Sequence, residues 1–141
     1  MTPDEISTHC ATIEECYEFM LAYAGQGLSG DEGSSRSGEV REYLHRAVEA
    51  IMGLATAYVA AVNHLNLQPP EPYHSFLGVL DRDARDSLAA IQLVLAQTTI
   101  SSQLIDNLNA SIHVRALLTD LFLVDEVLKP QRAQSKPVTT S

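Results

Sequence analysis

The sequence predicts an all-α fold, an antiparallel, up-down-up-down four-helix bundle. Apolar residues recur at intervals of three and four positions in four successive segments, which is the period of a helix that buries one face. Gly/Ser-rich or Pro-rich stretches separate several of these segments, and such stretches interrupt helices. The chain has no Trp and only three Phe, so its core must consist mainly of Leu, Ile, Val and Ala, which suits helix-on-helix packing.

The composition indicates one globular domain, expected over residues 1–130. A chain of 141 residues can bury enough surface to fold without a disulfide or a structural metal. The net charge of −9 disfavours nucleic acids and anionic membranes as partners, because both bind Lys and Arg. The N-terminal residues contain no apolar run, and the two Cys residues lack a metal-binding spacing. We therefore expect a cytoplasmic protein without a secretion signal or a membrane span.

The first two predicted helices are joined by a flexible Gly/Ser-rich loop, expected at residues 28–38. The first helix is predicted to begin at Thr12, because Thr12 and Glu15 have the spacing of a capping box. The second helix is predicted to run unbroken from the end of the loop to Leu65. Its apolar positions alternate in steps of four and three, as in the seam of a bundle; they are Val40, Leu44, Ala47, Ile51, Leu54, Tyr58, Ala61 and Leu65.

The last two predicted helices follow a Pro-rich turn. The third is expected at residues 73–97 and the fourth at residues 100–129, with Thr98 and Thr99 available to cap the fourth. Pro130 is expected to end this helix, because proline cannot donate the backbone hydrogen bond that a helix interior needs. A disordered tail is predicted over residues 131–141.

The fourth predicted helix is apolar on nearly all sides over residues 117–124. A helix of this kind is buried on more than one face, and in a four-helix domain we expect the second neighbour to be another copy of the chain. Asp120 would need a polar partner there, either His113 of the same helix or Arg115 of the second copy. The sequence thus predicts a homodimer whose interface includes Leu117, Leu118, Asp120, Leu121, Phe122 and Val124.

Acidic residues on the first two predicted helices form a candidate metal site. Glu14, Glu15 and Glu18 lie within about one turn of one another, and an antiparallel neighbour could bring Glu42 close to them. A cluster of carboxylates suits Mg²⁺ or Mn²⁺ bound to a triphosphate. No other cofactor is expected.

The stretch TIEECYEF at residues 12–19 resembles the acidic first motif, E-E-x-x-E, of the all-α nucleoside-triphosphate pyrophosphohydrolases. The resemblance implies that Glu14, Glu15 and Glu18 are metal ligands. The family's second motif, E-x-x-D, does not follow in this chain, and Glu42 would act as the further ligand.

Three weaker patterns remain. Glu42 and His45 form one E-x-x-H pair, of the kind used twice in di-iron bundles. Asp106, His113 and Asp120 recur every seven residues, which is the pattern of a polar stripe on a helix. A small apolar ligand held between helices is also possible, in a cavity lined by Tyr17, Tyr43 and Tyr58.

The sequence contains no complete catalytic signature, and we assign no catalytic residue. The leading hypothesis is a non-enzymatic interaction protein, a homodimeric scaffold, adaptor or regulatory subunit whose partners are itself and other proteins. The first alternative is a Mg²⁺- or Mn²⁺-dependent hydrolase similar to the pyrophosphohydrolases. The second is a bundle that binds a small apolar ligand.

Overall fold

A computed structural model of the chain describes residues 1–29 and 34–135. The prediction of an all-α fold is confirmed, because these residues form helices and no strand. The predicted helix number is wrong, since the described residues contain six helices. They are α1 (Pro3–Ala24), α2 (Ser34–Ile51), α3 (Leu54–Leu65), α4 (Glu71–Leu95), α5 (Ser102–Ala110) and α6 (His113–Ser135).

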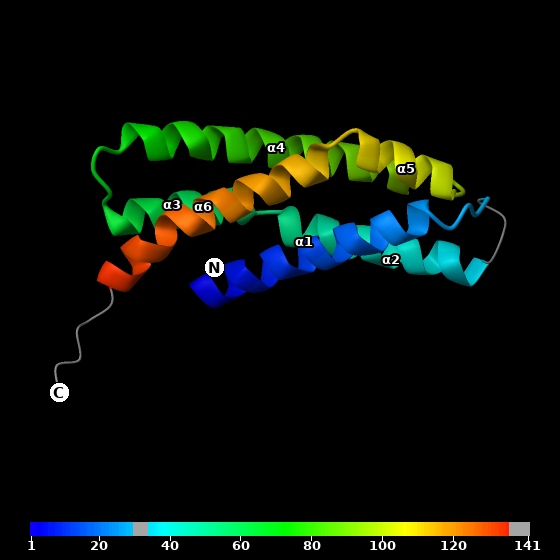
Figure 1. The fold of residues 1–141 in the computed structure, drawn as a ribbon, viewed down its shortest axis with the longest axis horizontal. Coiled ribbons are helices and arrows are strands. Elements are labelled where there is room, and N and C mark those ends of the chain that lie inside the picture. Colours follow the sequence, from blue (N-terminus) through cyan, green and yellow to red (C-terminus); the bar gives the residue numbers. More distant parts are fainter. Residues whose placement is uncertain (30–33, 136–141) are drawn as a thin grey trace.

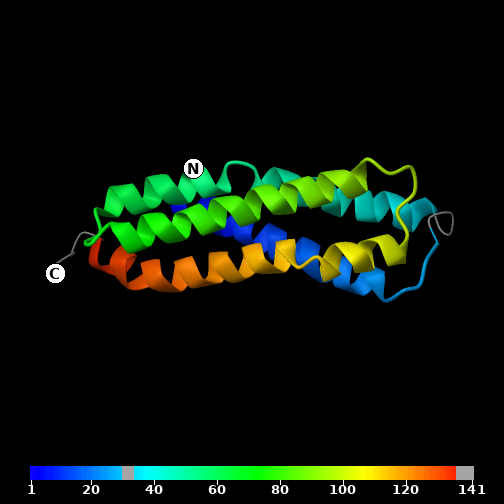
Figure 2. The same cartoon turned by 90° about the horizontal axis from the view of Figure 1, so that it is seen from above.

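The six helices share one elongated body (Figures 1 and 2). Helices α2 and α3 follow each other along one line, and so do α5 and α6, and each of these pairs runs alongside α4 and extends beyond it. The most extensive contacts are those of α1 with α2 and of α4 with α6. One continuous apolar core runs between the helices, and its largest fully buried side chains include Tyr23, Tyr58, Met20 and Leu44.

The second predicted helix is broken at Met52 and Gly53. Gly53 has a φ of 77°, a left-handed value that glycine adopts at little cost. The apolar seam nevertheless continues across the break, because Ile51, Leu54 and Tyr58 are all buried. The pattern of apolar side chains alone therefore could not predict the interruption of the helix at Met52 and Gly53.

The segment that contains this break is the most apolar in the described chain. Residues Gly38–Leu65 are long and apolar enough to cross a membrane when judged by length and composition alone, with a mean hydropathy of 1.3 over an 18-residue window. The core helix of a soluble protein meets the same criterion.

The fourth predicted helix is also two helices, separated at Ser111 and Ile112. Ile112 has a φ of 62°, and its amide donates to the carbonyl of Asn109 to close the turn that ends α5. The start of this region differs from the prediction as well. The hydroxyl of Ser101, not of Thr98 or Thr99, caps α5 by accepting from the backbone N–H of Leu104 at 3.1 Å.

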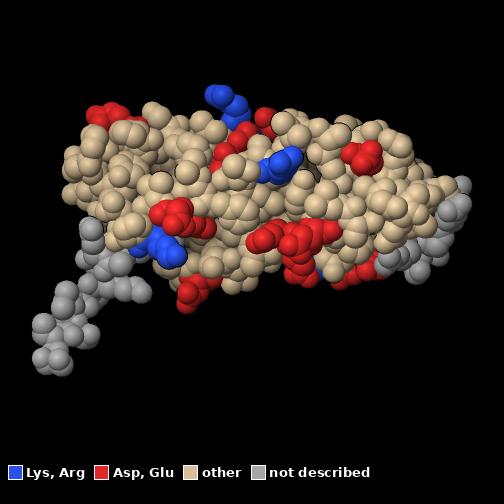
Figure 3. Space-filling view, viewed as in Figure 1, with Lys and Arg blue, Asp and Glu red and all other residues tan. Residues whose placement is uncertain are grey.

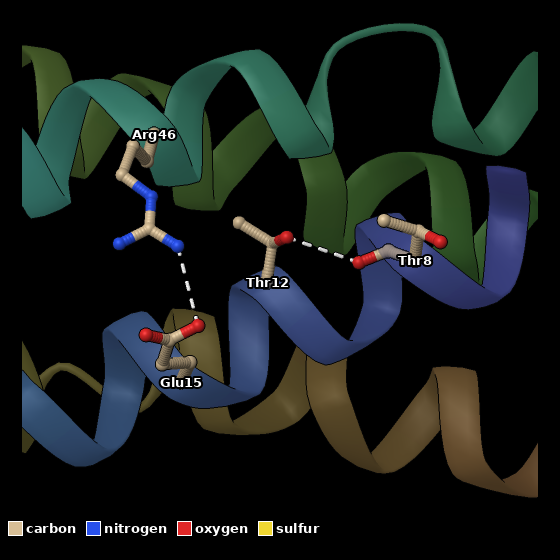
Figure 4. A network of polar contacts seen from close by, with 4 residues as sticks. All are labelled: Thr8, Thr12, Glu15 and Arg46. Carbon is tan, nitrogen blue, oxygen red and sulfur yellow. Dashed lines mark hydrogen bonds and ion pairs between the residues drawn. The ribbon is translucent and has the colours of Figure 1, made fainter.

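Both chain ends are more helical than predicted. Helix α1 begins at Pro3, where Thr2 and Glu5 form the capping box through bonds of 3.1 and 3.3 Å. Thr12 instead lies inside α1 and donates to the carbonyl of Thr8 (Figure 4). Helix α6 continues through Pro130 to Ser135, so the prediction that Pro130 ends the helix is wrong. Proline lacks the backbone N–H, but its fixed φ is compatible with a helix.

These differences change two predicted segments. The tail prediction is wrong for residues 131–135, and residues 136–141 lie outside the described residues. Part of the predicted loop, residues 30–33, also lies outside them, and α2 begins at Ser34 rather than at residue 37 or 38.

Arg41 of α2 holds the end of α4, a contact that the sequence did not reveal. Its guanidinium donates to the carbonyls of Leu95, Gln97 and Thr98 at 3.1, 2.5 and 2.8 Å. These carbonyls lie at and just beyond the C-terminus of the helix, where the dipole favours a cation. One side chain thereby fixes the turn between α4 and α5 against α2.

Substituting two glycines tests the break between α2 and α3. No heavy atom lies within 4 Å of a Cβ added at Gly53 or at Gly78 of α4, so packing is not affected at either position. Gly53→Ala should destabilise the protein by about 1–2 kcal/mol because of the left-handed backbone, whereas Gly78→Ala should stabilise it by about 0.5–1 kcal/mol. Urea unfolding followed by circular dichroism measures both; equal effects of the same sign would contradict the break.

Candidate functional site

The predicted metal ligands do not converge. Glu14, Glu15, Glu18, Glu42 and His45 are all exposed. The carboxylate of Glu15 forms an ion pair of 3.2 Å with Arg46, which reaches across from α2 (Figure 4). Within residues 1–29 and 34–135, no group of three or more His, Cys, Asp and Glu side chains could hold a metal ion. The guanidinium of Arg46 therefore pairs with Glu15, which the predicted carboxylate cluster required as a metal ligand.

The three tyrosines do not share a cavity. Tyr43 stacks on Phe19 with ring centroids 4.0 Å apart, and the Arg46 guanidinium lies 5.0 Å from the Tyr43 ring centre. Tyr58 lies in the core, where its hydroxyl donates to Asp125 at 2.6 Å and lies 3.5 Å from the sulfur of Cys10. Tyr17 is half-buried on α1. These side chains fill space between helices and do not enclose a ligand.

Burial makes two potential nucleophiles inert. It raises the pKa of the Cys16 thiol to about 11, so this thiol keeps its proton at neutral pH. Burial and the hydrogen bond to Asp125 likewise raise the pKa of Tyr58. Both groups serve packing.

Most of the predicted dimer interface lies inside the protomer. Leu117, Leu118, Leu121 and Val124 are buried by the chain's own helices, because α6 packs against α1, α3, α4 and α5. The sequence correctly indicated burial on more than one face but assigned the second neighbour to the wrong molecule. Phe122 is the exception, with 50% of its side chain exposed.

Asp120 of α6 is buried, with 9% of its surface exposed, and its partner is Asp83 of α4. Within the chain Asp83, not His113, supplies the polar contact that the sequence predicted for Asp120. Burial, followed by the hydrogen bond to Asp83 and the charge of Asp83, raises the pKa of Asp120 to about 7. Two carboxyls this close cannot both ionise cheaply. The remaining oxygen of Asp120, Oδ2, is buried without a hydrogen-bond partner among the described residues.

Two hollows lie in the surface near the start of α6. The larger, of about 550 Å³, is an open groove between α4, α5 and the start of α6. Its lining is mainly apolar and includes Ala89, Leu93, Leu104 and Leu108. The smaller, of about 270 Å³, lies on α6 and is lined by Ile112, Arg115, Ala116, Thr119 and Asp120.

No protein-family model, curated protein or solved structure matches this chain. The site must therefore be interpreted from its own chemistry. Its described parts are two hollows, an exposed aromatic side chain, and a buried carboxyl, Asp120, whose pKa is raised beside Asp83. This combination suits the burial of apolar surface against another molecule.

The carboxyl pair predicts an unusual dependence of stability on pH. The pKa of Asp120 is about 7 in the folded protein, against an ordinary value of 3.8. The folded state therefore keeps a proton that the unfolded state loses as pH rises between these values, and stability falls over that window. Asp120→Asn removes this titration while its amide can donate to Asp83.

We expect Asp120→Asn to raise the melting temperature at pH 8 and to flatten its dependence on pH between 5 and 8. The shift corresponds to a few kcal/mol, at about 1.36 kcal/mol per pKa unit. Thermal melts followed by circular dichroism measure this, with Asp106→Asn, an exposed aspartate, as the control. A slope identical to that of the wild type would exclude the proposed proton sharing.

Proposed function

We propose that the chain is a homodimeric helical-bundle interaction protein, a cytoplasmic scaffold, adaptor or regulatory subunit. In this proposal α2 with α3 and α5 with α6 act as two continuous rods. Together with α1 and α4 they make an antiparallel four-helix bundle. The end-to-end placement of these pairs in Figures 1 and 2 supports this description.

The observation that carries the proposal is a group of exposed apolar side chains on the outer face of α6. This face includes the turn before the helix and is defined here as Ile112, Arg115, Thr119, Phe122, Leu123 and Glu126. Ile112, Phe122 and Leu123 are 58%, 50% and 51% exposed. A cluster of large exposed apolar residues on one helix marks an interaction surface more often than single ones do. On the face where α6 crosses in front of α3, most of the surface is neither acidic nor basic, although several acidic groups lie on it (Figure 3). The chain as a whole carries a net charge of −9.

The groove between α4 and α5 gives the protein a second apolar surface. Leu93 projects beside it with 67% of its surface exposed. The groove is built mainly from α4 and α5 rather than from the outer face of α6. Two separate apolar surfaces are what an adaptor needs in order to pair with itself and hold another protein.

Matched leucines test the proposed self-association. Leu123→Asp places a charge on the outer face of α6, and Leu21→Asp places the same charge at a 49% exposed position on α1. We expect the wild type and Leu21→Asp to sediment as dimers and Leu123→Asp as a monomer, because the buried charge has no partner. Sedimentation equilibrium measures the masses. A monomeric wild type, or equal behaviour of both variants, would count against the proposal.

A further inference from the structure

We infer that the dimer forms by antiparallel pairing of α6 with α6 of a second copy, each Phe122 inserting into the small hollow of the other. This inference rests on the proposed function, because it specifies how the outer face of α6 is covered. The hollow, the position of Phe122, and two opposite charges on the same face support it.

The hollow is an open depression in the surface, large enough for one side chain. Ile112, Arg115, Ala116, Thr119 and Asp120 line it. The first four stand at positions i, i+3, i+4 and i+7 of the chain, with Ile112 in the turn that precedes α6. Four residues at this spacing form the hole that receives a knob from a facing helix. The small side chain of Ala116 leaves the centre of this hole open. The volume of about 270 Å³ leaves room for an aromatic side chain.

Phe122 is the knob that the same helix supplies. It follows the hollow along α6 and is half exposed. A twofold axis makes a self-complementary interface, in which each copy provides one knob and one hole. Parallel pairing would set Phe122 level with Phe122 of the partner subunit and leave both holes empty. Antiparallel pairing brings each ring level with the opposite hole and places Thr119 beside the twofold axis.

The charges on the outer face favour a second copy over other occupants. Arg115 and Glu126 are exposed, and among the described residues neither takes part in an ion pair. Antiparallel pairing places Glu126 of the partner subunit about one turn beyond Arg115. Long helical side chains lean toward the N-terminus of their own helix, so these two lean toward each other. Symmetry produces this ion pair twice.

Filling the hollow tests its role as a socket. Ala116→Leu occupies the centre of the hole, so we expect it to weaken dimerisation by about tenfold or more, because Phe122 can no longer seat. Ala60→Leu adds the same side chain at an exposed helical position on α3 and should leave the dimer unchanged. Sedimentation equilibrium measures the dissociation constants, and circular dichroism checks that each variant keeps its helices. An unchanged dimer in Ala116→Leu overturns the inference.

Charge reversal tests the antiparallel register without altering the core. Arg115→Glu and Glu126→Arg should each weaken the dimer, on the order of tenfold at low salt, and the double variant should restore it. If neither reversal matters while Leu123→Asp still dissociates the dimer, the register is wrong and the proposed function stands. If the single variants weaken the dimer and the double variant does not restore it, the pairing is also wrong. A monomeric wild type removes both proposals.

Discussion

The packing of α6 against α4 is the contact on which the other features of the molecule depend. It places the inner side of α6 in the core through Leu117 and Leu121. It sets Asp120 against Asp83 at the edge of that core, where burial and the neighbouring carboxyl raise the pKa of Asp120. The same packing leaves Phe122, about 100° further round α6 than Leu121, half exposed to solvent. The core contacts, the buried acid and the exposed apolar side chains therefore lie on different sides of α6.

The helices were predictable where side-chain periodicity and backbone agree. Helix α4 was expected at residues 73–97 and occupies Glu71–Leu95, because a Pro-rich turn precedes it and its apolar positions keep one face. The breaks at Gly53 and Ile112 were not predictable from the same pattern. At Gly53 the buried positions resume in phase after the turn, and an isoleucine with positive φ, as at residue 112, has no signature in sequence.

The candidate site could also be predicted only in part from the sequence. The burial of Asp120 followed from its apolar neighbours, but Asp83 lies in a run of charged residues that reads as a solvated face. Only the packing of two helices brings these acids together. The metal hypothesis failed for a related reason, since the partner of Glu15 is Arg46 on the next helix. Apolar residues on nearly all sides of the helix at 117–124 indicated burial on several faces. They could not indicate that helices of the same chain cover those faces.

If two copies of α6 meet at Thr119, a disulfide placed there tests the contact most directly. The native thiols Cys10 and Cys16 are buried, so a new surface cysteine is the reactive one. Mild oxidation of a Thr119→Cys variant should give a covalent dimer on a non-reducing gel, while Leu21→Cys under the same conditions stays monomeric. A Thr119→Cys variant that stays monomeric, or a Leu21→Cys variant that crosslinks equally well, would contradict the account.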